Sequence, residues 1–278
     1  MRAMRLELVS IPTPTAPLDG IYYEPDGGAR AGSVLFFHGN TMNFYVGAPR
    51  FLPPALTRLG FACLAFNRRG HDVMSTRNSR VAEGGAFQST GEAIEDNAIA
   101  ARWMAGRGFG EPVVIGHSNG GMLGVRHAVD HPRTRALVLL SAGRGGPRTA
   151  ESRGTDGLFA GDRLEELTQR ARELVASGRG RELMLMPGWW YVITADSFVD
   201  RLTTVPNTLA LAPKVKCPIL CIRGDKESAE RYPAEEFARR ATAPATAKVI
   251  ADCDHFYNGR EAEVTEVVTS WLVRTLNL

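Results

Sequence analysis

The chain has 278 residues, 44% of them hydrophobic, which is enough to bury a large core as one domain or as one domain with an insertion. Its 33 basic and 30 acidic residues give a net charge of only +3, and the arginines are scattered between acids, so we expect no nucleic-acid partner. No run approaches the ~18 to 20 apolar residues of a membrane span, and prolines interrupt the N-terminus before a signal-peptide core accumulates, so we expect a cytoplasmic protein with no membrane partner.

Runs typical of strands alternate with helical patterns along the chain. Several of these runs are continuously apolar, which indicates strands buried on both faces. The alternation predicts an α/β fold with a mostly parallel, doubly wound, eight-stranded sheet whose first two strands form an antiparallel edge hairpin. Strands are expected at 5–10, 20–25, 33–39, 61–67, 112–118, 136–143, 217–225 and 247–256, and helices at about 48–59, 90–107, 120–131, 233–241 and 260–275.

One segment interrupts this alternation. From residue 144 to residue 213 the sequence shows no convincing strand, but a charged amphipathic helix at about 161–178 and then an apolar, aromatic stretch. About seventy residues are too many for an ordinary connection in a compact α/β unit. We therefore expect a core domain formed by 1–143 and 214–278, with 144–213 inserted over the sheet as a helical cap.

The stretch "VVIGHSNGGMLG", residues 113–124, places Ser118 where a strand turns directly into a helix. Gly116 and Gly120 allow the backbone to bend sharply there, so that the serine hydroxyl stays exposed above the sheet. The free N–H groups and positive dipole end of the following helix lie just behind it. This context favours a nucleophile that converts a carbonyl group into an oxyanion.

A serine nucleophile needs a base, and His255 is the candidate. It is the only one of the six histidines that follows the last expected strand with a helix just beyond it. His127 and His131 lie too far along the helix after Ser118 and are expected at its surface or end. His117 adjoins the serine but is expected to point away across the turn.

The acid that orients His255 should follow a strand between the nucleophile and the base. The strand "PILCIRG" ends in Gly224, Asp225, Lys226 and Glu227. Asp225 follows the glycine immediately, whereas Glu227 lies three residues beyond it, deeper in the loop. We favour Glu227 and keep Asp225 as the alternative. Asp254 is expected to structure its own loop.

Two backbone amides are expected to bind the oxyanion. Asn119 follows Ser118 directly and supplies one N–H group. Gly39 follows the strand "SVLFFH" and permits the close approach that turns the Asn40 N–H toward the site. His38 in the same loop is expected to be structural.

These residues together resemble the α/β-hydrolase superfamily. The matching motifs occur in the family's order over almost the whole chain outside the cap: "FFHGN", "FNRRGHDVMS", "GHSNGG", "IRGDKE" and "DHFYNG". The resemblance implies Ser118 as nucleophile, Glu227 or Asp225 as acid, His255 as base, and the amides of Asn40 and Asn119 as oxyanion hole. The acid of family members usually lies three residues after the strand-end glycine, which supports Glu227, although glutamate departs from the commoner aspartate there.

The nucleophile type narrows the range of reactions that this resemblance implies. A serine at position 118 excludes haloalkane dehalogenases and epoxide hydrolases, which carry aspartate there. We expect a hydrolase that cleaves a small-molecule carboxylic ester with a hydrophobic or aromatic group through an acyl-enzyme. A thioesterase, a lactonase or a carbon–carbon bond hydrolase with the same triad is the alternative. A non-catalytic ligand-binding protein is disfavoured because it would not need all three triad positions.

The substrate pocket is expected to be apolar and aromatic. Its candidate residues are Trp189 and Trp190 in the cap and Phe44 after the oxyanion loop. The four cysteines lie in or beside apolar runs without zinc-site spacing, so we expect buried free thiols, no metal and no cofactor. The sequence leaves open whether the protein is a monomer or a homodimer.

Overall fold

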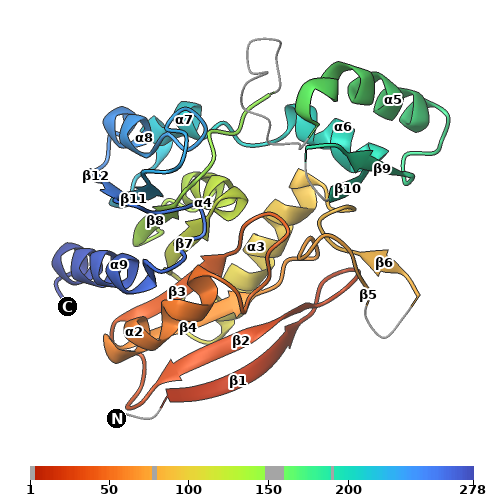
Figure 1. The fold of residues 1–278 in the computed structure, drawn as a ribbon. Coiled ribbons are helices and arrows are strands. Elements are labelled where there is room, and N and C mark those ends of the chain that lie inside the picture. Colours follow the sequence, from red (N-terminus) through yellow and green to blue (C-terminus); the bar gives the residue numbers. More distant parts are fainter. Residues whose placement is uncertain (1–3, 77–79, 148–159, 189–190) are drawn as a thin grey trace.

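The computed structural model describes residues 4–76, 80–147, 160–188 and 191–278, and its centre is a single eight-stranded sheet (Figure 1). β1 pairs antiparallel with β2, and β2 with β4, whereas every other neighbouring pair is parallel. The predicted α/β class and the antiparallel edge hairpin are thus confirmed. Across the sheet the strands are β1 (Met4–Ile11), β2 (Leu18–Pro25), β4 (Phe61–Phe66), β3 (Gly32–Phe37), β7 (Val113–His117), β8 (Ala136–Leu140), β11 (Ile219–Gly224) and β12 (Ala245–Ile250).

Helices cover both faces of this sheet (Figure 1). The central strands are buried along their whole length, because their apolar residues face a helix layer on either side. One cluster of buried side chains joins the sheet to α3 (Thr90–Gly106), α4 (Asn119–Asp130), α7 (Thr208–Leu211) and α8 (Ala234–Arg240). A second cluster, on the other face, includes residues of α1 (Ala48–Phe51), α2 (Pro53–Arg58) and α9 (Glu261–Leu276).

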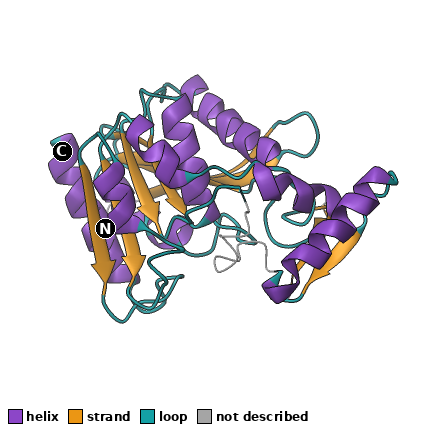
Figure 2. Ribbon diagram, turned by 90° about the horizontal axis from the view of Figure 1, so that it is seen from above, coloured by secondary structure: helices purple, strands orange, loops and turns teal. Residues whose placement is uncertain are grey.

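The chain between β8 and β11 forms a lobe beside the sheet (Figure 2). Its elements are η2 (Gly161–Arg163), α5 (Leu164–Ala176), β9 (Leu183–Met186), β10 (Tyr191–Thr194) and α6 (Ala195–Thr203); α7 and η3 (Ala212–Lys214) then lead back to the sheet. The lobe has a hydrophobic cluster of its own, which includes Leu167, Met184 and Phe198.

The expectation that this segment lacks strands is wrong, because β9 and β10 form an antiparallel hairpin. In β9, Met184 and Met186 are buried while Leu183 and Leu185 are exposed. This period of two is typical of a half-buried strand, but all four residues are apolar, so hydropathy alone does not reveal the alternation. Two further short strands, β5 (Ser75–Thr76) and β6 (Ala82–Glu83), also pair antiparallel.

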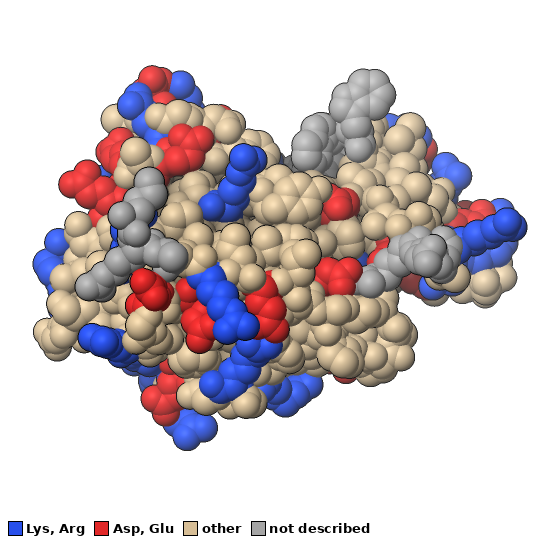
Figure 3. All heavy atoms as spheres, turned by 90° about the horizontal axis from the view of Figure 1, so that it is seen from below, with Lys and Arg blue, Asp and Glu red and all other residues tan. Residues whose placement is uncertain are grey.

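The surface carries charges of both signs, and Figure 3 shows them interspersed over one face of the molecule. Exposed pairs such as Arg126 with Asp130 and Arg240 with Glu236 lie one helical turn apart. All four cysteines are buried and free. Within the part of the chain that the structure describes, no helix is both long and apolar enough to cross a membrane.

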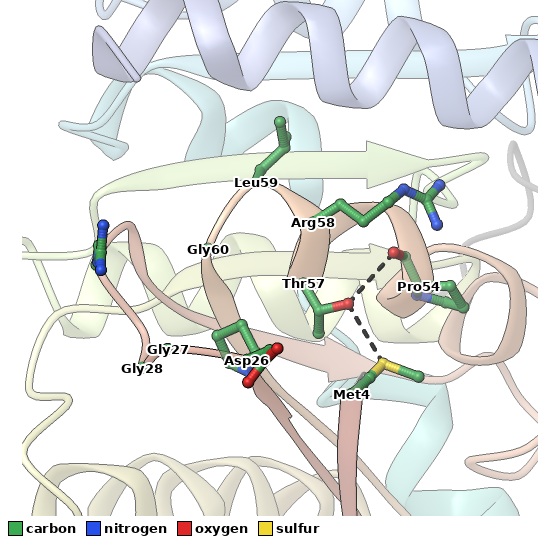
Figure 4. Close-up of a pocket in the computed structure, with 11 residues that line it drawn as sticks. Met4, Asp26, Gly27, Gly28, Pro54, Thr57, Arg58, Leu59 and Gly60 are labelled. Carbon is green, nitrogen blue, oxygen red and sulfur yellow. Dashed lines mark hydrogen bonds between the residues drawn. The ribbon is translucent and has the colours of Figure 1, made fainter. Parts of the chain in front are cut away.

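A cavity of about 540 Å³ lies at the end of the β1–β2 hairpin, against α2 (Figure 4). Met4 in its wall is the first residue of β1, and Gly60 directly precedes β4. Thr57 Oγ1 donates to Pro54 O at 3.2 Å and lies 3.3 Å from Met4 Sδ. This cavity is therefore at the amino-terminal edge of the parallel strands, opposite the edge that carries Ser118.

The fold also buries three histidines, His38, His117 and His127. His127 lies in the last turn of α4, as expected for a helix-end residue, but it is buried rather than at the surface, since its ring packs edge-on against Phe37 and lies over His131. Burial, together with the nearby His131, lowers the pKa of His127 to about 3. The imidazole is therefore neutral in the folded protein at neutral pH.

We expect the free energy of unfolding to fall as the pH drops from about 6.5 toward 4. The unfolded chain then protonates histidines that the folded protein keeps neutral, at a cost of up to about 1.4 kcal/mol per pH unit for each histidine. In a His127→Gln variant the free energy of unfolding should depend less steeply on pH, because one such histidine is missing. Chemical unfolding across this pH range measures the slope. Arg126→Gln, at an exposed site of the same helix, should keep the wild-type slope, and an unchanged slope in His127→Gln would contradict the account.

Candidate active site

Ser118 occupies a strained turn between β7 and α4. Its φ of 55° and ψ of −117° lie in a region that non-glycine residues rarely adopt. The glycines around it are needed for space. A Cβ on Gly116 would lie 2.3 Å from Gly120 O, and one on Gly120 would lie 2.0 Å from Phe37 O. The Ser118 N–H donates to Leu140 O at 2.9 Å, which fixes the turn to β8.

The loop after β3 approaches this turn closely. A Cβ built on Gly39 would lie 3.3 Å from the Ser118 Cβ and 2.7 Å from Met42 Sδ. Asn40 follows Gly39, and Asn119 follows Ser118 as the first residue of α4. Among the described residues, neither backbone N–H of these two asparagines has a hydrogen-bond acceptor. Two free amide donors thus flank the serine.

His255 is paired with Glu227. His255 Nδ1 lies 2.6 Å from Glu227 Oε1, and the Glu227 side chain is only 3% exposed. The alternative acid, Asp225, is exposed and accepts a hydrogen bond from Cys253 N at 3.0 Å. Of the two acids that the sequence leaves open, Glu227 therefore reaches the imidazole, and Asp225 ties the end of β11 to the following loop.

Two further hydrogen bonds hold the other oxygen of the Glu227 carboxylate. Glu227 Oε2 accepts from Gly224 N at 2.7 Å and from Ser141 Oγ at 2.6 Å. Burial alone would raise the pKa of Glu227, but the hydrogen bonds from His255, Ser141 and Gly224 outweigh it and hold the pKa below its usual value. The carboxylate is therefore ionised at neutral pH.

Ser141 is itself held by a buried tyrosine. Its Oγ lies 2.6 Å from the Tyr257 hydroxyl, which also lies 3.2 Å from Ile222 O. Since the Ser141 proton is donated to Glu227, the hydroxyl of Tyr257 is the donor to Ser141. A hydrogen-bonded chain thus runs from Tyr257 through Ser141 and Glu227 to His255.

Aromatic rings surround the imidazole of His255. The ring centroids of Tyr232, His117 and Phe256 lie 4.6, 4.8 and 5.1 Å from that of His255. The expectation that His117 points away is wrong, because its Nε2 donates to His255 O at 2.8 Å. Burial and the neighbouring His255 lower the pKa of His117 to about 3, so His117 is a neutral donor that positions the His255 backbone.

The remaining residues singled out in the sequence have structural surroundings. His38 is buried, donates from Nδ1 to Gly39 O at 2.8 Å and accepts from Arg68 N at 3.1 Å. Asp254 accepts from the backbone of Phe256 and Asn258 and so structures its loop.

The aromatic residues expected in the substrate pocket are only partly described. Phe44 packs against the buried cluster next to α1 and α9, with Tyr45 at 5.3 Å. Trp189 and Trp190 lie outside the described residues. Of their apolar neighbours in the sequence, Met184 and Tyr191 are buried within the lobe.

Sequence patterns did not identify Ser141, Tyr257 or Tyr232 as neighbours of the candidate triad. Ser141 does follow β8 at the edge of the sheet that carries Ser118, and this position is the one signal that could have indicated it. Nothing in the motif "DHFYNG" shows that Tyr257 turns inward. The described part of the chain contains no cluster of histidine, cysteine and acidic side chains that could hold a metal ion.

Replacing Ser141 with alanine should raise the pKa of Glu227 toward its usual value of 4.5, because one donor to the carboxylate is lost. The pKa can be followed by ¹³C NMR of the glutamate carboxyl carbons, with Glu227→Gln to assign the resonance. Ser33→Ala is the matched control, because Ser33 is also buried but its Oγ has no hydrogen-bond partner among the described residues. An equal pKa in Ser141→Ala and wild type would contradict the role assigned to this hydrogen bond.

The pKa of Glu227 is lower in the folded protein than in the unfolded chain, so the ionised carboxylate stabilises the folded protein at a pH above the pKa of the unfolded chain. This stabilisation is lost as the pH falls through the pKa of the folded protein. When the pH falls below 4.5, the free energy of unfolding should therefore decrease less in Ser141→Ala than in wild type. Chemical unfolding at pH 6 and at pH 3.5 measures this difference.

Comparisons with known proteins identify the family and the fold. Residues 34–267 match the model of the family described as "Alpha/beta hydrolase family". No curated protein matches the chain significantly. Among solved structures, Est1E from Butyrivibrio proteoclasticus superposes with a TM-score of 0.69 at 17% identity, covering 98% of this chain and 99% of that one.

Two further structures have the same fold. The alpha/beta hydrolase GrgF from Penicillium sp. sh18 has a TM-score of 0.74 at 13% identity, covering 99% of this chain and 100% of its own. A monoglyceride lipase from Saccharomyces cerevisiae has a TM-score of 0.69 at 13% identity, covering 97% and 95%. Likenesses at such identities show the fold, and the family match over most of the chain shows that this protein belongs to the alpha/beta hydrolase family.

Proposed function

We propose that the protein is a serine hydrolase that cleaves a carboxylic ester through an acyl-enzyme on Ser118. The observation that carries the proposal is the pairing of His255 with the buried carboxylate of Glu227 at the sheet edge that presents the strained Ser118 turn. The Glu227 carboxylate stabilises the protonated form of the His255 imidazole, which supports a role for His255 as the base. Membership of the alpha/beta hydrolase family supports the same reaction class.

In the proposed first step, His255 takes the hydroxyl proton of Ser118 while the serine oxygen attacks the ester carbonyl. The free N–H groups of Asn40 and Asn119 bind the oxyanion that forms. The imidazolium then gives its proton to the alkoxide, and the alcohol departs. Glu227 keeps the imidazole oriented with Nδ1 as the donor throughout.

In the second step, His255 takes a proton from water, and the resulting hydroxide attacks the acyl group on Ser118. Collapse of this second tetrahedral intermediate returns the proton to the serine oxygen and releases the carboxylic acid. Glu227 and the two amides act as in the first step, so one set of groups serves both halves of the cycle.

We propose that the lobe between β8 and β11 acts as a cap that selects the substrate. It lies beside the sheet, and Arg201 of α6 reaches Asn40 in the oxyanion loop with Nη1 at 3.5 Å from Oδ1. A structure of Est1E contains ferulic acid, which shows that this fold accommodates an aromatic acid in that protein. These observations support a small hydrophobic or aromatic ester as the substrate here.

Ser118→Ala should abolish turnover of p-nitrophenyl esters of graded chain length. Loss of the nucleophile typically lowers kcat by about 10⁴-fold or more. Ser270→Ala, a partly buried serine on α9, should retain wild-type activity and serves as the control. Wild-type turnover no faster than that of Ser118→Ala would contradict the proposal.

The assignment of the acid can be tested in the same assay. Glu227→Gln removes the charge that stabilises protonated His255, so kcat should fall by about 10²- to 10⁴-fold. Asp225→Asn changes an exposed loop residue, and we expect kcat within about threefold of wild type. A larger loss in Asp225→Asn than in Glu227→Gln would show that the acid is misassigned.

A further inference from the structure

Arg68 is a buried cation with unused hydrogen-bond donors. It follows β4, and the residue is 1% exposed. Its Nη2 donates to His38 O at 2.8 Å, but Nε and Nη1 have no acceptor among the described residues. Burial lowers the pKa of Arg68 to about 10, so the guanidinium is still charged at neutral pH. Unpaired buried donors on a charged group are costly, which makes Arg68 a candidate for a role in binding an anion.

Arg68 is one of the residues that line a small cavity between the core and the lobe. Its volume is about 30 Å³, which is room for roughly two water molecules or for the two oxygens of a carboxylate. The wall combines residues of the β3 and β4 loops, the start of α3, the start of α4, and α6. Its polar members include Asn40, Arg68, Gln88, Thr90, Asn119 and Arg201.

Two arginines, Arg68 and Arg201, line this cavity. Arg201 is close enough to disfavour the charged form of Arg68, and its own hydrogen bonds go to the neutral acceptors Gly85 O, Tyr191 OH and Asn40 Oδ1, at 2.6, 2.9 and 3.5 Å. Asp96 attracts Arg68, but its oxygens are bound by Arg69 and Gln88 at 2.7 to 2.8 Å.

Asp200, an acidic residue on the lobe side, accepts a hydrogen bond from Thr90 N at 2.7 Å. Neither Arg68 nor Arg201 forms an ion pair with a described residue. An incoming anion would therefore meet two arginines that have no carboxylate partner among the described residues.

The cavity also adjoins the proposed reaction centre. Asn119 directly follows Ser118, and Asn40 follows Gly39, whose backbone approaches the Ser118 side chain. Both asparagines belong to the cavity wall and also carry the free N–H groups described above. A group held in the cavity is thus next to the position expected for the scissile carbonyl.

We propose that this cavity is a carboxylate subsite, in which Arg68 and Arg201 hold a free carboxylate of the substrate. The preferred substrate is then an ester that carries a second, unesterified carboxyl group, such as a half-ester of a dicarboxylic acid. Arginine is suited to this role because its planar fork binds both oxygens of a carboxylate. The inference rests on the proposed function for its substrate, although the subsite can also be tested by binding alone.

The kinetic test compares monoethyl adipate with ethyl hexanoate, which has the same chain length and no charge, by measuring released ethanol. A second pair, 6-acetoxyhexanoate and hexyl acetate, places the carboxylate on the alcohol side. We expect wild type to prefer the charged member of at least one pair by about 10- to 100-fold in kcat/KM. No preference in either pair would overturn the proposal.

Substitutions then connect the preference to Arg68. Arg68→Met keeps much of the side-chain volume, removes the charge, and should collapse the ratio between charged and neutral esters. Arg126→Met, at an exposed arginine on α4, should keep the wild-type ratio. A ratio in Arg68→Met equal to wild type would contradict the assignment. If Arg68→Met does not fold, as judged by circular dichroism, Arg201→Met provides the same comparison.

A binding measurement separates failure of the subsite from failure of the proposed function. Labelling of Ser118 by a fluorophosphonate reports the serine hydrolase chemistry, whereas calorimetry with adipate and the Ser118→Ala protein reports the subsite. We expect adipate to bind about tenfold or more weakly when Arg68→Met is added. If Ser118 is labelled, but neither adipate binding nor the preference for charged esters depends on Arg68, the subsite alone would be overturned. Arg68-dependent binding without labelling would overturn the proposed function alone, and equally tight binding of inorganic phosphate would contradict a carboxylate subsite.

Discussion

The close contact between the turn at Ser118 and the backbone of β3 is the constraint on which the rest of the candidate site depends. Gly120 has no room for a side chain, because a Cβ would lie 2.0 Å from Phe37 O. This contact brings α4 against the end of β3, so Asn119 and the loop with Asn40 both lie beside the serine. The strained backbone of Ser118 is held in place by the sheet around it rather than by its own preference.

The polar groups behind His255 form a second layer that fixes its position and charge. Glu227 is buried, yet three hydrogen bonds keep its carboxylate ionised. Tyr257 holds Ser141, and His117 holds the His255 backbone from the opposite side. Each of these partners comes from a different strand end, so the sheet positions them together. The buried charge of Arg68 lies outside this network, and we propose that it binds a ligand rather than supporting the triad.

The order of the motifs was enough to predict the sheet and the edge that carries Ser118, Glu227 and His255, because parallel strands deliver their carboxyl ends to one edge. Side-chain direction was not predictable in the same way. Arg68 and Arg69 are adjacent and chemically identical, but Arg69 pairs with Asp96 and Glu95 while Arg68 is buried. His117 was misjudged for this reason. The hairpin of β9 and β10 was missed because its exposed positions carry leucine, so burial depends on tertiary packing rather than on residue type.

The central claim is that Ser118 carries the acyl group during turnover. Acid quenching within milliseconds of mixing with a p-nitrophenyl ester, followed by intact-protein and peptide mass spectrometry, measures this directly. The account predicts a mass increase equal to one acyl group, located on the peptide that contains Ser118, and none in Ser118→Ala. Turnover of the ester with the acyl group on another residue, or with the same adduct in Ser118→Ala, would contradict it.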